Sequence, residues 1–561
     1  MRPRLILSLS TAFLIFALFL QWLRLPTVQG GLWMSPDETA VATAAATFAE
    51  NGSFLFPMTL PEAFAWAHPR SWVYLDQEGR LAPVGFLGMP ALLSTVYKSF
   101  GVMGLDLFTP LLALVTIFAL WRVLPTRWPR AAKIATVCVW MTFPTVVLYA
   151  NRGLFAQLPV VCLAIWTWWG LAPTETPHKV IRDIVPVKFF LAGLAFGLAV
   201  AIRPTELPWL VALVVFALLL NLDWHKQIVK KTPWGKRWLA GATFAIPCFS
   251  ILLFAAWLGH QTYGAWLVSG YQIRPETLNA AAVIATSTVT DSVSIFQTLP
   301  FAFHPRNIFW NVMQYFFGIL WPWTLALLIA VLIGGKDLVG KNKDFFKRLA
   351  EKGLRWSAIK DLFAGKARWG IVALIAAAVW TVLFYGNGLY QDNVRLGEIS
   401  LGNSFLRYTL PCSVLFAVAV GFVVARAWSH WQLKLLAMCG VAALVSVGLW
   451  TSMARDAEGV LANTQEIVRY QEIRAYAKKS FGQDAVMLSD RSDKIFFPAF
   501  LAVSPMPEDD QITSLLDSVH AVGMLLTTQD SVGLDEWTNR GFYLFPLQYF
   551  GNQTLYEVQK Y

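Results

Sequence analysis

The sequence predicts an all-α polytopic membrane protein that carries a small α/β domain after its last transmembrane helix. Of the 561 residues, 56% are hydrophobic and only 14% are charged, and the mean hydropathy of +0.52 is too high for a soluble protein of this length. Apolar stretches of about 20 residues alternate with short basic loops, as expected of helices that cross a bilayer. After Thr451 this pattern gives way to shorter, alternating elements.

The apolar stretches define the predicted transmembrane helices. The first, at residues 5–25, follows Arg2 and Arg4, and an alternative is a cleaved secretory signal. No small-residue cleavage site follows Leu20, so we expect a retained helix. Further stretches lie at residues 104–121, 134–150, 154–171, 187–202, 205–221, 239–258, 308–333, 369–385, 406–425 and 433–451. Together they predict about eleven transmembrane helices plus interfacial helices.

The distribution of Lys and Arg predicts the orientation of these helices. Three basic loops, at residues 122–133, 226–237 and 334–369, should be cytoplasmic, together with the N-terminus. This requires the segment 83–100 to lie at the membrane interface, because a further crossing there would turn all three loops outward. Pro83 and Pro90 favour a broken surface helix over a straight span.

The same orientation predicts which segments are external. They are the loop at residues 29–82, the turn at Asn151, residues 259–306, residues 386–405 and the C-terminus. We therefore predict a transmembrane domain at residues 1–451 and an external α/β domain at residues 452–561. Within the second domain a helix is expected at residues 464–479 and strands at 485–488 and 522–526.

Composition excludes several other classes of protein. The net charge of +11 does not indicate nucleic-acid binding, because the basic residues lie in short loops where membrane orientation explains them. All five cysteines fall inside apolar stretches without CxxC spacing, so we expect small core residues rather than a disulfide framework or a zinc site. The predicted location is a cell membrane.

An acidic pair follows the first helix, in Ser35-Pro36-Asp37-Glu38. Two adjacent carboxylates at a membrane surface could hold a general base or bind a cation. The alternative is a helix start, in which Ser35 or Asp37 caps a helix that runs to Glu50 and Pro36 lies in the first turn. The spacing alone favours the cap.

Basic side chains recur near the predicted external ends of helices, where the orientation rule makes them scarce. They are Arg152, Arg203, His304, Arg306, Arg395 and Arg407. Guanidinium groups bind phosphate through paired, charge-assisted hydrogen bonds, so the set favours an anionic ligand such as a lipid phosphate. The alternative for each one is snorkelling toward lipid headgroups. Tyr408, beside Arg407, is equally typical of an aromatic belt.

One short repeat stands out, because His68-Pro69-Arg70 and His304-Pro305-Arg306 share a tripeptide in two predicted external loops. Chance is sufficient to explain a repeat of three residues. The sequence contains no Walker loop, GxGxxG or HExxH motif.

Several short motifs, taken in order and with their predicted sidedness, resemble the GT-C superfamily of membrane glycosyltransferases. The resemblance is strongest to the branch of protein O-mannosyltransferases and lipid A aminoarabinose transferases. The motifs are Asp37-Glu38, Glu50-Asn51-Gly52, the proline-containing segment 81–101, residues 197–204 and residues 407–411. The resemblance covers most of the chain up to about Val424.

The resemblance implies the GT-C fold and an inverting transfer of sugar from a polyprenyl or dolichyl phosphate. It assigns the role of base to Asp37, with Glu38 as its neighbour. Such proteins commonly carry a second acidic residue in a later short loop, where this sequence has Gln157. A mechanism without a cofactor or a divalent metal therefore fits better than one in which a pair of loops coordinates a metal ion.

We accordingly expect Asp37 to deprotonate an acceptor hydroxyl on a glycan, lipid or protein. Arg407, with His304 or Arg306, would neutralise the phosphate leaving group, and Tyr408, Arg203 and Arg152 complete the predicted donor site. One alternative is a transporter or flippase for lipid-linked sugars, which should place ionisable residues near the middle of the membrane. The other is a membrane scaffold, which would explain the C-terminal tail but not the Asp37 loop.

Overall fold

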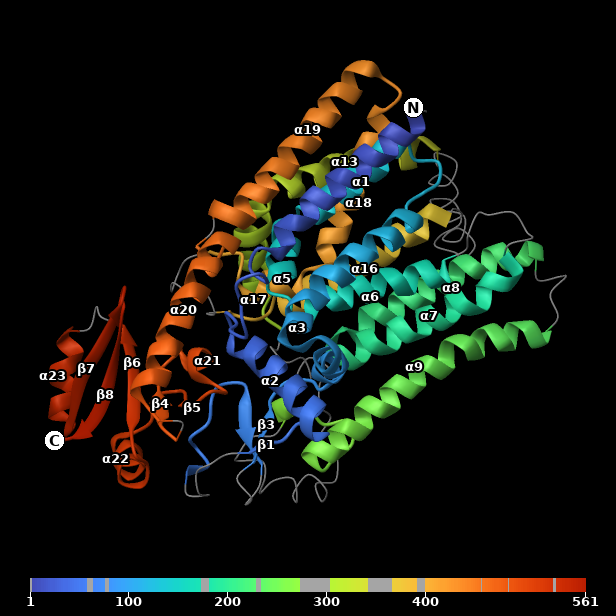
Figure 1. The fold of residues 1–561 in the computed structure, drawn as a ribbon. Helices are drawn as coiled ribbons and strands as arrows, with labels where there is room; N and C mark the ends of the chain where they lie inside the picture. The colour runs from blue at the N-terminus through green and yellow to red at the C-terminus, as the bar shows by residue number, and fades with distance from the viewer. Residues whose placement is uncertain are drawn as a thin grey trace.

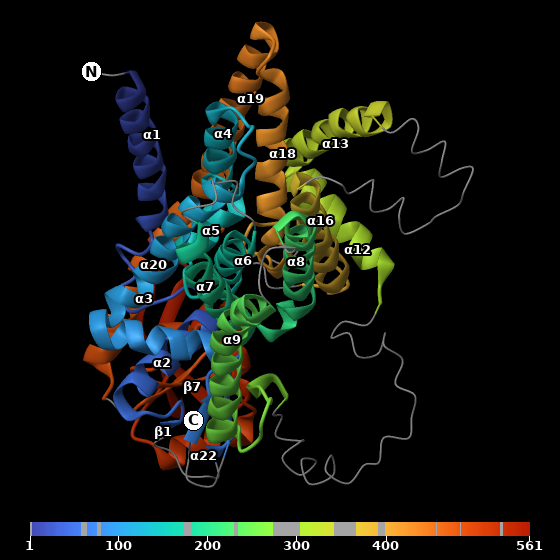
Figure 2. The same cartoon turned by 90° about the vertical axis from the view of Figure 1, so that its right-hand side faces the viewer.

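The structure is a computed structural model. It describes residues 3–57, 64–75, 80–172, 181–228, 234–272, 303–341, 366–390, 399–455, 457–482, 484–527 and 531–561. Most of the described chain is helical, and a small sheet lies at one end beyond the long helix α20 (Val460–Ser480) (Figure 1). Views at right angles place the N-terminus at the opposite end from this sheet (Figure 2).

The first helix leads into a folded loop at residues 29–82, here called the first loop. The helices α1 (Pro3–Leu20) and η1 (Gln21–Leu23) precede this loop. The described part of the loop contains α2 (Pro36–Asn51) and an antiparallel sheet in the order β1 (Phe56–Pro57), β3 (Arg80–Pro83), β2 (Trp72–Tyr74). Ser35 caps α2 by accepting a hydrogen bond from the backbone N–H of Asp37, and Pro36 lies in the first turn. Gly52, at φ +70°, ends the helix. The predicted helix is confirmed.

A sharp break interrupts α3 (Gly88–Val123) at Gly101. Its φ of 61° and ψ of −153° are outside the helical range and suit glycine alone. The segment before this glycine is therefore a separate helix from the apolar segment after it, as the sequence predicted for residues 83–100. Its location at the membrane interface stays a prediction.

The other elements of the helical part follow in chain order. They are α4 (Arg130–Met141), α5 (Pro144–Asn151), α6 (Gln157–Leu171), α7 (Ile181–Ile202), η3 (Pro204–Glu206), α8 (Leu207–Ile228), α9 (Trp234–Tyr263), η5 (Gly270–Gln272), α12 (Pro305–Asn311), η6 (Val312–Ile319), α13 (Trp321–Lys341), α16 (Lys366–Tyr385), α17 (Ser404–Tyr408), α18 (Pro411–Ala427), α19 (Trp431–Trp450) and η7 (Thr451–Arg455). Helix α7 packs on both α6 and α9. Gly193 permits the second contact, because a Cβ there would collide with the Phe244 carbonyl.

Two apolar stretches that the sequence predicted as single helices, residues 134–150 and 308–333, are broken in the structure, and a third bend separates the helices predicted at 187–202 and 205–221. The chain bends by 54° between α4 and α5, by 117° between α7 and α8, and by 99° between η6 and α13. In the described residues three helices are long and apolar enough to cross a membrane, or six if each bent pair counts as one span. The stretch predicted at residues 308–333 is thus two helical segments with a bend of 99° between them, and the count of about eleven spans stays a prediction.

The C-terminal part forms one mixed sheet with helices packed against it. The elements after α20 are β4 (Val486–Leu488), α21 (Asp493–Phe496), β5 (Leu501–Val503), α22 (Asp509–Ser518), β6 (Val522–Thr527), α23 (Ser531–Asn539), β7 (Phe542–Phe550) and β8 (Gln553–Lys560). The strand order is β5-β4-β6-β8-β7, with β4 parallel to β5 and β6 and with β8 antiparallel to its neighbours. The predicted helix and two strands are confirmed.

The first loop and the C-terminal part share a hydrophobic core. Phe64 and Ala67 of the loop belong to the same buried cluster as Val486, Val522 and Trp537. Aromatic contacts extend this contact surface, since Phe497 lies 5.1 Å from Phe56 and 5.3 Å from Trp72 between ring centroids. These two regions are therefore packed together, although they are far apart in the sequence.

The cysteine prediction is confirmed for four residues and wrong for one. Cys138, Cys162, Cys248 and Cys412 are buried, whereas Cys439 is exposed, and all five are free thiols. Cys439 lies on α19, whose surface includes the exposed apolar side chains of Leu435 and Leu436. An apolar stretch in a membrane helix can face lipid as well as a core, so hydrophobicity alone does not predict burial here.

Candidate functional site

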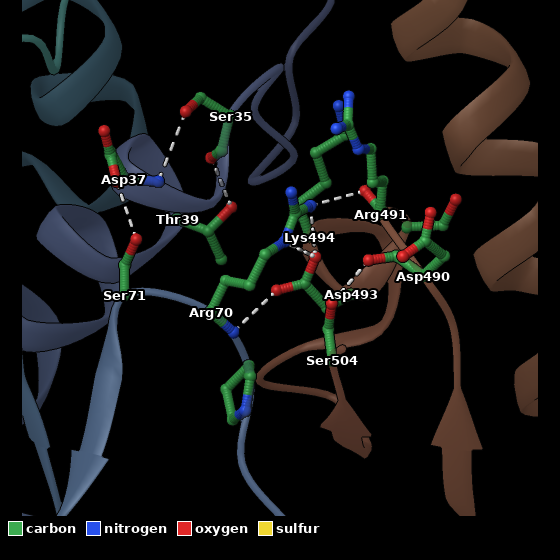
Figure 3. Close-up of polar contacts among 12 residues, drawn as sticks. Ser35, Asp37, Thr39, Arg70, Ser71, Asp490, Arg491, Asp493, Lys494 and Ser504 are labelled. Carbon is green, nitrogen blue, oxygen red and sulfur yellow. Dashed lines mark hydrogen bonds and ion pairs between the residues drawn. The ribbon is translucent and has the colours of Figure 1, made fainter. Parts of the chain in front are cut away.

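Asp37 lies in the first turn of α2 with its side chain 48% exposed. Ser71 donates a hydrogen bond from Oγ to Asp37 Oδ1 at 2.6 Å, and Asp37 Oδ2 lies 3.8 Å from Nη1 of Arg407 (Figure 3 shows Ser71 and Asp37). The cap of the helix is Ser35, so the Asp37 carboxylate is not needed for capping. Its half-exposed carboxylate is accessible to a molecule that reaches this surface.

Glu38 has a different environment, although it is the next residue. Its side chain is fully buried, and Oε2 accepts hydrogen bonds from Nε and Nη2 of Arg152, both at 3.2 Å. Oε1 is buried without a hydrogen-bond partner. Burial raises the pKa of Glu38, and the opposite charge of Arg152 acts against this shift. The two carboxylates of the acidic pair therefore differ, one half-exposed and one enclosed in an ion pair.

Arg407 projects from α17, a short helix that Asn403 caps. Its Nη2 donates to Ser404 Oγ at 2.6 Å and to the Tyr408 hydroxyl at 3.3 Å. Its Nε is buried and has no hydrogen-bond partner. The guanidinium thus keeps an unused donor, which a phosphate oxygen could satisfy.

The ring of Phe155 contacts the guanidinium groups of both Arg152 and Arg407. The guanidinium carbon of Arg407 lies 4.3 Å from the centroid of the Phe155 ring, and that of Arg152 lies 4.8 Å from it. Cations over a ring face are stabilised by its quadrupole. Phe155 therefore fixes the positions of the arginine that neutralises Glu38 and of the arginine beside Asp37.

A second buried polar cluster adjoins the first through Tyr408. Arg203 Nε donates to Glu206 Oε1 at 2.8 Å, and the hydroxyl of Tyr385 donates to the same oxygen at 2.7 Å. Tyr385 stacks on Tyr408 at 4.4 Å between ring centroids, and the Arg203 guanidinium lies 4.6 Å from the Tyr408 ring. Tyr408 is thus in contact with both Arg203 and Arg407, which a residue anchored only in an aromatic belt would not require.

Two of the predicted donor-site residues lie elsewhere. His304 and Arg306 are exposed at the start of α12, and the backbone N–H of His304 donates to Asn387 Oδ1 at 2.6 Å. In the part of the chain that the structure describes, neither side chain contacts Asp37 or Arg407. Their role in donor binding stays a prediction, and Arg395 falls outside the described residues.

Several residues of the site were not predicted from the sequence. Ser71 and Tyr385 carry no local signal, because each is a common residue whose partner is distant in the chain. Glu206 lies in the apolar stretch predicted at residues 205–221, where a carboxylate is itself a signal. Asp106 is buried in α3 and accepts a hydrogen bond from Trp33 Nε1 at 3.1 Å. A buried carboxylate in an otherwise apolar stretch was a signal that could have identified it.

The described residues contain no group of three or more His, Cys, Asp or Glu side chains that could hold a metal ion. Gln157, at the position where the resemblance led us to expect an acid, is buried with its Oε1 unpaired. Whether the reaction needs a metal stays a prediction from the sequence.

Comparison with known proteins shows the fold of the chain. No protein-family model matches the sequence, and no match was found among curated proteins. ArnT from Cupriavidus metallidurans bound to undecaprenyl phosphate is similar in structure, with a TM-score of 0.50 at 11% identity and 97% coverage of both chains. The apo state of that protein gives a TM-score of 0.50 at 12% identity and 98% coverage of both chains.

The oligosaccharyltransferase from Archaeoglobus fulgidus matches at a TM-score of 0.46 and 9% identity, over 95% of this chain and 71% of that chain. The chain shares the overall fold of ArnT, so its class is the GT-C fold that the sequence predicted, and its described residues include helices long and apolar enough to cross a membrane. Within that class its structure is similar to that of ArnT over almost the whole length of both chains.

Proposed function

We propose that this protein transfers a sugar from a polyprenyl phosphate carrier to an acceptor hydroxyl at the outer face of the membrane. One observation carries the proposal: the half-exposed carboxylate of Asp37 lies 3.8 Å from Arg407, whose buried guanidinium keeps an unpaired nitrogen. A base and a phosphate-binding cation side by side are what a transfer from a lipid phosphate requires. That the structurally similar ArnT binds undecaprenyl phosphate supports this choice of carrier.

In the proposed reaction, Asp37 accepts the proton of the acceptor hydroxyl while its oxygen attacks the anomeric carbon. The bond between that carbon and the phosphate oxygen breaks, and its electron pair stays on the phosphate. Attack opposite to the leaving group inverts the anomeric centre. Arg407 stabilises the negative charge that builds on the phosphate oxygens in the transition state.

The difference between the two carboxylates supports Asp37 as the base. Glu38 is enclosed and neutralised by Arg152, so it cannot reach an acceptor without breaking a buried ion pair. We therefore assign Glu38 to the support of α2 and of Arg152. In this proposal Arg203 and Tyr408 contribute to the donor site through the ring contacts that tie them to Arg407.

The test uses purified protein in nanodiscs with a panel of undecaprenyl-phosphate-linked pentoses and hexoses and a mixture of glycan, lipid and peptide acceptors. Mass spectrometry should detect released undecaprenyl phosphate together with a glycosylated acceptor for at least one donor. A second measurement, on the protein reconstituted into sealed vesicles, follows the movement of a fluorescent lipid-linked sugar between the two leaflets. Movement of the lipid between leaflets without any released undecaprenyl phosphate would replace the proposal with a flippase.

A further inference from the structure

Two consecutive residues of the C-terminal part contact the two segments that flank Asp37. They are Asp493 and Lys494, at the start of the short helix α21 (Figure 3). Asp493 contacts Arg70, the residue before Ser71, and Lys494 contacts Met34, the residue before the cap of α2. The short helix α21 therefore contacts both the segment before Asp37 and the segment whose Ser71 binds the Asp37 carboxylate.

Both carboxylate oxygens of the buried Asp493 accept hydrogen bonds from Arg70. Oδ2 of Asp493 accepts from the backbone N–H of Arg70 at 2.9 Å, and Oδ1 accepts from Nε at 3.0 Å and from Nη2 at 2.6 Å. Nη2 also donates to the carbonyl of Arg491 at 2.6 Å. The Asp493 side chain is 1% exposed. This fixes the backbone of Arg70 as well as its side chain.

Ser71, the next residue, has a backbone that needs such support. Its φ is +65°, in the left-handed region that residues other than glycine seldom adopt. Conformations of this kind persist only where the surroundings enforce them. In this conformation the Ser71 hydroxyl donates to Asp37 Oδ1 at 2.6 Å, so the backbone held by Asp493 orients the carboxylate.

Lys494 acts on the other side of Asp37. Its Nζ donates to the Met34 carbonyl at 2.7 Å, one residue before Ser35, and it lies 5.2 Å from the centroid of the Tyr470 ring in α20. The start of α2 is thereby tied to the C-terminal part. The charge of Lys494 also acts on Glu38, where with Arg152 it opposes the rise of the pKa that burial causes.

We propose that Asp493 is a positioning residue for the transfer reaction, which fixes the Asp37 carboxylate through Arg70 and Ser71, with Lys494 holding the start of the same helix. This inference rests on the proposed function. In this proposal the C-terminal domain orients the Asp37 carboxylate, in addition to any role in covering the site or binding the acceptor.

The test compares Asp493→Asn with wild type in the transfer assay, using an undecaprenyl-phosphate-linked sugar that wild type accepts. An amide keeps the shape but turns an NH2 group toward the N–H donors of Arg70, so the contact breaks. We expect kcat to fall by about ten- to a hundredfold, the range for a misplaced reacting group. The KM for the donor should stay within about twofold, because the contacts of Arg407 are untouched.

Two further variants complete the experiment. Ser71→Ala removes the hydroxyl without touching the domain contact, and the double variant Ser71→Ala/Asp493→Asn should be no slower than the slower single variant, since both act through one hydrogen bond. The matched control is Asp509→Asn, which breaks an exposed pair with Arg540 in the same domain and should leave kcat unchanged.

Hydrogen exchange separates positioning from general loss of structure. We expect faster exchange in the peptide that spans residues 69–75 of Asp493→Asn, with the rest of the protein as in wild type. A kcat equal to wild type in both Asp493→Asn and Ser71→Ala would overturn the positioning role while leaving the proposed function intact. The positioning role would also be overturned if the losses of kcat in the two single variants added up in the double variant, or if hydrogen exchange in Asp493→Asn were faster throughout the protein. If wild type transfers no sugar from any donor, the proposed function fails and the positioning role falls with it.

Discussion

Replacement of Asp37 by Asn separates the chemical role of this residue from its structural one. Capping is unaffected, because Ser35 accepts the hydrogen bond from the backbone of residue 37. Oδ1 of an asparagine can still accept from Ser71, so the local geometry is kept. The remaining loss is the pair with Arg407, which at 3.8 Å and 48% exposure of Asp37 contributes about 0 to 1 kcal/mol after solvent screening.

The expected effect on the reaction is much larger. Loss of a general base costs roughly a hundredfold to ten-thousandfold in rate, equivalent to about 3 to 5 kcal/mol in the transition state. Undecaprenyl phosphate should bind Asp37→Asn as tightly as wild type or more tightly, because the variant lacks a negative charge beside Arg407. The structure therefore predicts a folded, donor-binding and nearly inactive protein.

The assay measures sugar transfer from an undecaprenyl-phosphate-linked donor in nanodiscs, alongside melting temperature and binding of undecaprenyl phosphate. Asp535→Asn, in the C-terminal helix α23, serves as a carboxylate-to-amide control at an exposed position. Transfer by Asp37→Asn at close to the wild-type rate would refute the assignment of the base. A loss of rate accompanied by an equal loss of folded protein would refute the argument that Ser35 alone caps the helix.

Arg407→Ala should weaken binding of undecaprenyl phosphate by about 1.5 to 3 kcal/mol, the value for a hydrogen bond to a charged group. Arg426→Ala, in the last turn of α18, should not change this affinity, and equal affinities of wild type and Arg407→Ala would mean that Arg407 does not bind the phosphate. Glu38→Gln should lower stability by about 3 to 5 kcal/mol, because it leaves a buried guanidinium unpaired, and a melting temperature equal to wild type would contradict this. Single cysteines introduced for Lys343 and Ser514 test the orientation with an impermeant reagent on intact cells, where only the second should react, and the reverse pattern would overturn the predicted topology.

Long apolar stretches made the helices of the bundle predictable from the sequence. A helix in lipid must satisfy every backbone group internally, so composition and length are sufficient to find it. The start of α2 was equally clear, since Ser35 and Pro36 are a local capping signal. The bend before Trp321 was overlooked, although Gly318 and Pro322 flank it and a proline in the first turn is a local signal of a helix start.

The candidate site was predictable in part. The acidic pair stood out as two charges beside an apolar helix, and Arg407 stood out as a cation where cations are scarce. The difference between Asp37 and Glu38 was not predictable, because it depends on Arg152, which is 114 residues away. Arg70 was set aside as a chance tripeptide, and only its partner Asp493 shows that it matters.

The contact between Arg70 and Asp493 has a consequence for how the protein is made. The two residues are 423 positions apart, so at about 5 to 20 residues per second the ribosome needs roughly 20 to 85 seconds to supply the partner of Arg70. During that time the Asp37 loop still lacks the contact with Asp493. The nascent chain therefore cannot complete the contacts around Asp37 until the segment that carries Asp493 has been made and has folded.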